Sequence, residues 1–344
     1  MNRALEFGLD TFGDLTQGDA NTTNTYAHVI REVVEQAVAA DELGVDFFGV
    51  GEHHRDDFAV SSPEMVLAAI AARTSHIRLG SAVTVLSSDD PVRVFERFST
   101  LDAISQGRAE LILGRGSFTE SFSLFGFDLS DYEVLFEEKV ALFAELLKER
   151  PVTWHGTTRS ALTEQMVYPT TESGHLTTWI GVGGSPQSVM RAARYQMPLV
   201  LAIIGGDPLR FKPLVDLYFR GLEAQGSPRL PVAVHSPGFV ADSDEEALEQ
   251  IWPYLKQARD RIGAERGWGP ISREEFARDT GPQGSWYVGS PETVARKIAR
   301  TAQTLGVTKF DMKYSVGRLP HHYLMRSIEL YANKVIPLAL DMLS

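Results

Sequence analysis

The chain has 344 residues and no cysteine, which excludes disulfides, thiolate metal sites and a cysteine nucleophile. Its 45 acidic side chains outnumber the 33 basic ones, and the formal charge of -12 argues against nucleic acid or an anionic membrane as a partner. No apolar run approaches the roughly 18 residues that a membrane-spanning helix needs, so we expect a cytoplasmic protein.

The first third of the chain alternates short apolar runs with amphipathic stretches. Strands are predicted at 5–10, 46–50, 77–86 and 109–117, and helices at 25–43, 62–73 and from 91 to a stop at Gly107. The third helix is the most clearly marked, because Asp90 is the expected N-cap and Pro91 the first helical residue. Its buried face is predicted to consist of Val94, Phe95, Phe98, Leu101 and Ile104.

The rest of the chain continues the alternation after an insertion at 117–178, in which only the stretch 132–147 is clearly helical. Strands are predicted at 179–183, 198–204, 231–240 and 308–313, and helices at 186–195, 208–225, 242–262, 290–305 and 321–343. Pro337 requires a break or kink in the last helix. The stretch 263–285 is rich in glycine and charge, and we predict that it is a mobile flap.

Eight strands that alternate with helices predict an α/β fold, a (β/α)8 TIM barrel with insertions after the fourth and seventh strands. We expect residues 1–344 to form a single domain, because no linker divides the chain. The phenylalanines at 118, 122, 125 and 127 need a surface to cover, either the barrel mouth or a second subunit. In this fold the chemistry lies at the carboxyl ends of the strands, which here carry Thr11, Phe12, Glu52, His53, His54, 82–88, Arg115, 183–185, Gly205, Gly206, His235 and Tyr314.

Two adjacent histidines, His53 and His54, follow Glu52 at the end of the second strand. Neighbouring side chains at a strand end point to opposite sides, so the two histidines cannot easily chelate one ion, and the chain has no H-x-H or H-E-x-x-H spacing. We therefore predict no metal site. One histidine at the barrel mouth could act as a proton donor, or both could be structural groups held by hydrogen bonds.

The run from Gly181 to Ser188 follows a strand and opens a helix, where free backbone N–H groups favour a phosphate. Pro186 at the first helical position would make Ser185 the N-cap and place Ser188 beside the same anion site. Ordinary helix capping explains Ser185 equally well. Arg115 could supply the counter-charge or form a surface ion pair.

Four motifs occur in order along the chain: GEHH at 51–54, LGSAVTVLSSDDPVRVFE at 79–96, LDAISQGRAELILGRG at 101–116 and GVGGSPQS at 181–188. With these motifs the chain resembles the bacterial luciferase-like, flavin-dependent monooxygenase family over nearly its whole length. Within that family it is most similar to an FMN-type oxidoreductase group.

The resemblance implies that reduced FMN lies across the barrel mouth. By the family's pattern, its phosphate is held by Arg115, Ser185, Ser188 and the backbone of Gly183 and Gly184. Ala82 and Val83 match the site of a non-prolyl cis peptide beneath the flavin ring, and Ile203 and Ile204 match a segment that lines the flavin pocket. His53 matches the family's active-site histidine, and His54 is carried over beside it as a second catalytic residue.

The resemblance further implies a monooxygenase that uses O2 and reduced FMN, as a co-substrate, on a small organic substrate. The electrons would come from NAD(P)H, either directly or through a separate flavin reductase. A homodimer is implied, with the helices that start at Ser62 and Pro91 as the candidate interface. The alternatives are an F420-dependent hydride-transfer oxidoreductase of the same fold, a flavin-binding protein without turnover, and a metal-dependent barrel hydrolase.

Overall fold

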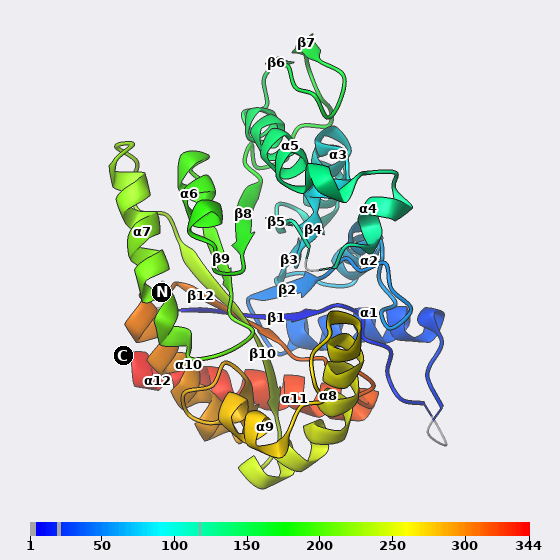
Figure 1. The fold of residues 1–344 in the computed structure, drawn as a ribbon, viewed down its shortest axis with the longest axis vertical. Helices are drawn as coiled ribbons and strands as arrows, with labels where there is room; N and C mark the ends of the chain where they lie inside the picture. Colours follow the sequence, from blue (N-terminus) through cyan, green and yellow to red (C-terminus); the bar gives the residue numbers. More distant parts are fainter. Residues whose placement is uncertain (1–4, 19–21, 117) are drawn as a thin grey trace.

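The computed structural model describes residues 5–18, 22–116 and 118–344, so position Ser117, where the predicted fourth strand meets the insertion, lies outside the described residues. Strand β1 pairs with both β2 and β12, and β9 pairs with both β8 and β10, so the sheet closes on itself (Figure 1). All pairings in this ring are parallel, which confirms the predicted TIM barrel. Its strands are β1 (Glu6–Thr11), β2 (Phe47–Val50), β3 (Arg78–Ser81), β5 (Ala109–Gly114), β8 (Thr177–Val182), β9 (Leu199–Ala202), β10 (Val232–Val240) and β12 (Lys309–Lys313).

The helices around the barrel begin where the sequence marks them. In α3 (Pro91–Ser105) the Asp90 carboxylate accepts from the backbone N–H of Val92 at 2.9 Å, as a side-chain N-cap does. The prediction that Ile104 lies on the buried face of this helix is wrong, because its side chain is 47% exposed. The other surrounding helices are α1 (Tyr26–Glu42), α2 (Pro63–Ala71), α6 (Pro186–Arg194), α7 (Lys212–Glu223), α10 (Pro291–Leu305), α11 (His321–Leu330) and α12 (Ile336–Leu343).

The strand predicted at 77–86 is two short strands. β3 ends at Ser81 and β4 (Thr84–Val85) resumes pairing with β5, before a 3-10 turn at Leu86–Ser88. Between them the Ala82–Val83 peptide is cis, as the family resemblance implied. At the other end of the chain, a π-helical segment (Tyr331–Val335) separates α11 from α12 and provides the break that Pro337 requires.

Two long insertions follow β5 and β10, at the predicted places. The first contains α4 (Glu120–Leu124), α5 (Tyr132–Leu146) and an antiparallel hairpin of β6 (Val152–Trp154) and β7 (Leu162–Gln165), which stands at the top of Figure 1. The second contains α8 (Asp244–Arg266), α9 (Arg273–Thr280) and β11 (Tyr287–Gly289). The predicted flap at 263–285 therefore begins inside α8 and includes α9, whose start is fixed by a capping box of Ser272 and Glu275.

The barrel interior contains charged groups as well as apolar side chains. Lys309 lies 3.0 Å from Glu110 and 3.7 Å from Asp311, and its ammonium sits 3.3 Å from the centre of the Phe47 ring. Burial raises the pKa of Asp311 to about 7. Among the described residues, no helix is both long enough and apolar enough to cross a membrane.

Candidate active site

The carboxyl ends of the barrel strands surround a cavity of about 1000 Å³. Its wall is mostly apolar and aromatic, with Phe12, Phe58, Phe118, Trp268 and Trp286 among the lining residues. Enclosed apolar cavities with a few polar groups are typical of small-molecule sites, and in this fold the strand carboxyl ends hold the chemistry.

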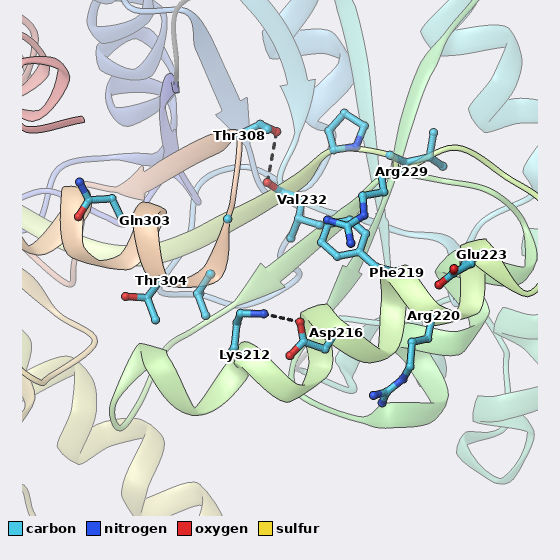
Figure 2. A pocket seen from close by; sticks show the side chains of 14 residues that line it. Lys212, Asp216, Phe219, Arg220, Glu223, Arg229, Val232, Gln303, Thr304 and Thr308 are labelled. Atoms are coloured by element: carbon cyan, nitrogen blue, oxygen red, sulfur yellow. Dashed lines mark hydrogen bonds and ion pairs between the residues drawn. The ribbon is translucent and has the colours of Figure 1, made fainter. Parts of the chain in front are cut away.

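A second hollow, of about 620 Å³, lies at the opposite ends of the strands (Figure 2). It is bounded by α7, α10 and the starts of β10 and β12, where the Thr308 amide donates to the Val232 carbonyl at 2.9 Å. Its charged side chains include Lys212 and Asp216, which are paired with each other. We therefore place the candidate site in the first cavity.

His53 lies in the wall of the large cavity, among aromatic rings. Its ring centre is 4.4 Å from that of Phe12, 4.3 Å from that of Phe58 and 5.4 Å from that of Phe118. Burial lowers its pKa to about 3, so its imidazole is neutral at physiological pH. Its buried Nδ1 has no hydrogen-bond partner among the described residues, so this polar atom in the cavity wall is unsatisfied.

His54 has a partner of its own. Its Nε2 lies 2.9 Å from Glu52 Oε1, and Glu52 Oε2 accepts from the backbone N–H of Val85 at 2.8 Å. The pair therefore connects the end of β2 to β4. Both histidines line the cavity: His54 is hydrogen-bonded to Glu52, whereas His53 Nδ1 has no hydrogen-bond partner among the described residues.

The cavity floor is formed around the cis peptide. Ala82 and Val83 line it together with Ile112 and Gly114. A Cβ added at Gly114 would lie 2.5 Å from a methyl group of Val83, so this position has no room for a side chain. The result is an apolar surface without a projecting group from β5.

The predicted anion site lies at the start of α6, next to Arg115 at the end of β5. Arg115 donates to Ser188 Oγ at 3.3 Å, and Ser185 Oγ accepts from the Ser188 amide at 3.4 Å. Gly183, Arg115 and Ser188 line the cavity, while Gly184 and Ser185 lie outside its lining. A Cβ at Gly183 would meet nothing within 4 Å, so the backbone there borders open space.

A second guanidinium, which sequence reasoning missed, reaches the same serine. Arg191 donates to Ser188 Oγ at 3.5 Å and is held by Glu137 at 2.6 Å. Arg115 in turn pairs with Glu133 and lies 4.8 Å from the centre of the Tyr132 ring. Arg191 follows Ser188 by three residues on one helix, a spacing that could have identified it. Arg191 is buried and lies outside the cavity lining, so it holds Ser188 in place, whereas Arg115 lines the cavity and suits a phosphate.

The prediction that Ile203 lines the cofactor pocket is wrong. Its side chain is completely buried in the core and does not line the cavity, whereas that of its neighbour Ile204 is 65% exposed and lines it. Successive side chains at a strand end point to opposite sides, so only one of the two can face the barrel mouth.

Arg55 joins the segments around the cavity mouth and was not singled out by the sequence. Its guanidinium lies 2.6 Å from Glu120 on α4 and 2.7 Å from Glu265 on α8. Hydrogen bonding to these carboxylates raises its pKa, led by that from Glu265, so it is permanently charged. Arg55 thus links the two insertions, which also meet directly where Arg266 lies 5.3 Å from the centre of the Phe118 ring. Within the described ranges, no group of three or more His, Cys, Asp or Glu side chains is placed to hold a metal ion.

Comparison with known proteins identifies the family of the chain. A family model described as luciferase-like monooxygenase matches residues 11–309. Protein y4vJ of Sinorhizobium fredii (strain NBRC 101917 / NGR234), which is uncharacterized, is 30% identical over 327 residues, or 90% of this chain and 92% of that protein.

Two solved structures share the whole architecture. One is the oxygenating constituent of 3,6-diketocamphane monooxygenase from Pseudomonas putida in complex with FMN, with a TM-score of 0.76, 20% identity, and coverage of 97% of this chain and 99% of that chain. The other is the coenzyme F420 dependent tetrahydromethanopterin reductase from Methanopyrus kandleri, with a TM-score of 0.74, 18% identity and the same coverage. At these identities the likeness shows the fold alone.

Proposed function

Because the chain belongs to the luciferase-like monooxygenase family, we propose that it is a flavin-dependent monooxygenase that uses reduced FMN and O2 to oxygenate a small organic substrate. The observation that carries this proposal is the pair of Arg115 and Ser188 at one edge of an apolar cavity, with Arg191 hydrogen-bonded to Ser188 from outside the lining. A phosphate-bearing cofactor with a flat apolar ring needs both features.

The residues present fit FMN. Arg115 and Ser188 would hold the phosphate, with Arg191 supporting Ser188, and the open space beside Gly183 leaves room for the phosphate to approach the backbone. The apolar surface of Ala82, Val83 and Ile112 would pack against the ring. When bound, reduced FMN would supply the electrons for oxygen activation.

The chain's own residues have separate tasks in this proposal. His53 is neutral and offers its free Nδ1 for one hydrogen bond in the cavity. The rings of Phe12, Phe58 and Phe118 surround it and exclude water, which strengthens every polar interaction made there.

A second candidate is an F420-dependent oxidoreductase that transfers a hydride without O2. The observation in its favour is the shared fold with the F420 dependent reductase. That cofactor also has a flat ring system, so the apolar floor alone does not separate the two.

The test is a fluorescence titration of the protein with FMN, riboflavin and F420. We expect FMN to bind at least tenfold more tightly than riboflavin, and the R115M variant to lose that difference. R194M is the matched control, because Arg194 also pairs with a glutamate of α5, Glu137, but its side chain is 64% exposed and does not line the cavity. Equal binding of FMN and riboflavin would contradict the phosphate assignment.

Binding of F420 without FMN would replace the proposal by the hydride-transfer candidate. Oxygen uptake by the complex with reduced FMN tests turnover, measured with a panel of small organic compounds. Uptake that never exceeds the rate of free reduced flavin would indicate a flavin-binding protein without turnover.

A further inference from the structure

A third histidine, besides His53 and His54, reaches the cavity from β10. His235 on β10 lines the cavity, and its Nδ1 lies 2.9 Å from Asp10 Oδ2 on β1. Asp10 is completely buried and can only accept, so Nδ1 carries the proton. The remaining ring nitrogen, Nε2, is left for the cavity, where the His235 side chain is 14% exposed.

The charged groups that face His235 favour its protonated form. They are Asp10 from β1 and Asp311 and Lys313 from β12, while the paired residue on β9 is the uncharged Ala202. Burial disfavours the charged imidazole, but the Asp10 carboxylate outweighs burial and raises the pKa of His235.

His235 and His53 therefore differ in protonation within one cavity. The Phe12 ring stacks on both, with centres 4.4 Å from His53 and 6.1 Å from His235 and planes within 24° and 14° of parallel. His53 is surrounded by aromatic rings, whereas His235 has a buried carboxylate. Two titratable groups whose surroundings shift their pKa values in opposite directions are typical of an acid and a base in one site.

We propose that His235 is a further catalytic residue, positioned by Asp10, whose Nε2 donates a charge-assisted hydrogen bond to a substrate oxygen that carries or gains negative charge. The substrate class is a small apolar molecule with a carbonyl or carboxylate oxygen, because the rest of the cavity wall is largely apolar. The proposal rests on the proposed function, since it takes this cavity as the substrate site.

The first measurement uses the protein without any cofactor. Proton-coupled 15N NMR of histidine-labelled protein follows each ring through a pH titration, and the signal lost in H235Q identifies His235. We expect His235 to titrate above pH 6.5 in the wild type and lower in D10N, with H175Q, at an exposed histidine, changing neither. A neutral His235 throughout pH 6 to 8 would overturn the proposal, and this result does not require D10N to fold.

The second measurement uses two probes of matched shape, cyclohexanecarboxylate and cyclohexylmethanol, titrated by NMR. We expect H235Q to weaken the binding of the carboxylate at least tenfold and to change the affinity for the alcohol less than twofold. Equal losses for both probes, or no carboxylate binding to the wild type, would overturn the proposal. FMN is titrated into the same samples, so failure of FMN to bind the wild type counts against the proposed function and is read separately.

Discussion

At the scale of single residues, the site is defined by what surrounds each imidazole. His53 and His54 are adjacent in sequence, yet only His54 has a carboxylate partner, at 2.9 Å, while His53 lies among aromatic rings. Adjacent side chains at a strand end point into different surroundings, so the same residue type acquires different protonation and different availability to a ligand.

The buried His53 predicts a pH dependence of stability. Its pKa is about 3 in the folded protein against about 6.5 in an unfolded chain, so between these values the unfolded state binds the extra proton. Stability therefore falls as the pH drops from 6.5 towards 3. Between pH 7 and pH 4.5 the protonation of this one group should lower the free energy of unfolding by about 2 to 3 kcal/mol.

We expect the H53F variant to lose about 2 to 3 kcal/mol less stability than the wild type over this pH interval, because phenylalanine cannot titrate. Urea unfolding at pH 7 and pH 4.5 measures the difference for both proteins. H175Q, which removes an exposed histidine, is the control and should follow the wild type. An H53F protein as acid-sensitive as the wild type would show that His53 is protonated in the folded state.

At the scale of elements, a buried lysine is among the groups that hold the second insertion to the barrel. Lys297 on α10 donates to the carbonyls of Thr280 at 2.9 Å, Gly281 at 2.7 Å and Trp286 at 2.5 Å. Burial lowers its pKa to about 8. The end of the predicted flap is therefore anchored, and its mobility stays a prediction for the part between α8 and α9.

The K297M variant should be less stable by about 2 to 4 kcal/mol, because three carbonyls lose their donor. We also expect amides around 280–286 to exchange hydrogen faster, measured by mass spectrometry. K212M is the matched control: Lys212 forms an exposed pair with Asp216 in the second hollow, so its loss should cost less than about 0.5 kcal/mol. Unchanged exchange at 280–286 in K297M would mean that this segment is held elsewhere.

At the scale of the whole molecule, two neighbouring helices of the barrel carry exposed apolar side chains. Helices α2 and α3 lie next to each other on the outside (Figure 1), and Met65 on α2 is 74% exposed while Ile104 on α3 is 47% exposed. The family resemblance implied an interface at these two helices, and association there would cover both side chains. We propose that two copies of the chain associate through α2 and α3.

We expect light scattering to give twice the 38.0 kDa mass of the chain, and the M65E variant to give the mass of one copy, because a buried carboxylate without a partner opposes association. L124E is the control, since Leu124 is equally apolar and 62% exposed but belongs to α4. Dissociation by L124E and not by M65E would move the interface to the first insertion.

The sequence by itself determined the order of strands and helices in the barrel and the start of the most clearly marked helix. The N-cap of α3 at Asp90, the Pro91 that follows it and the alternation of strands with helices depend on residues a few positions apart, so they can be read locally. The family motifs identified His53, Arg115, Ser188 and the Ala82–Val83 peptide in the same way, because each lies in a continuous segment.

Only the tertiary structure decided which side chains meet. Asp10 and His235 are 225 residues apart and come together because the register across β1, β12 and β10 places them side by side inside the closed barrel. The orientation at a strand end, which buries Ile203 and exposes Ile204, and the ion pairs of Arg55 across two insertions likewise depend on how the barrel closes. Local patterns determine elements, whereas barrel closure determines the pairings across the cavity, because those side chains are distant in sequence and adjacent only in space.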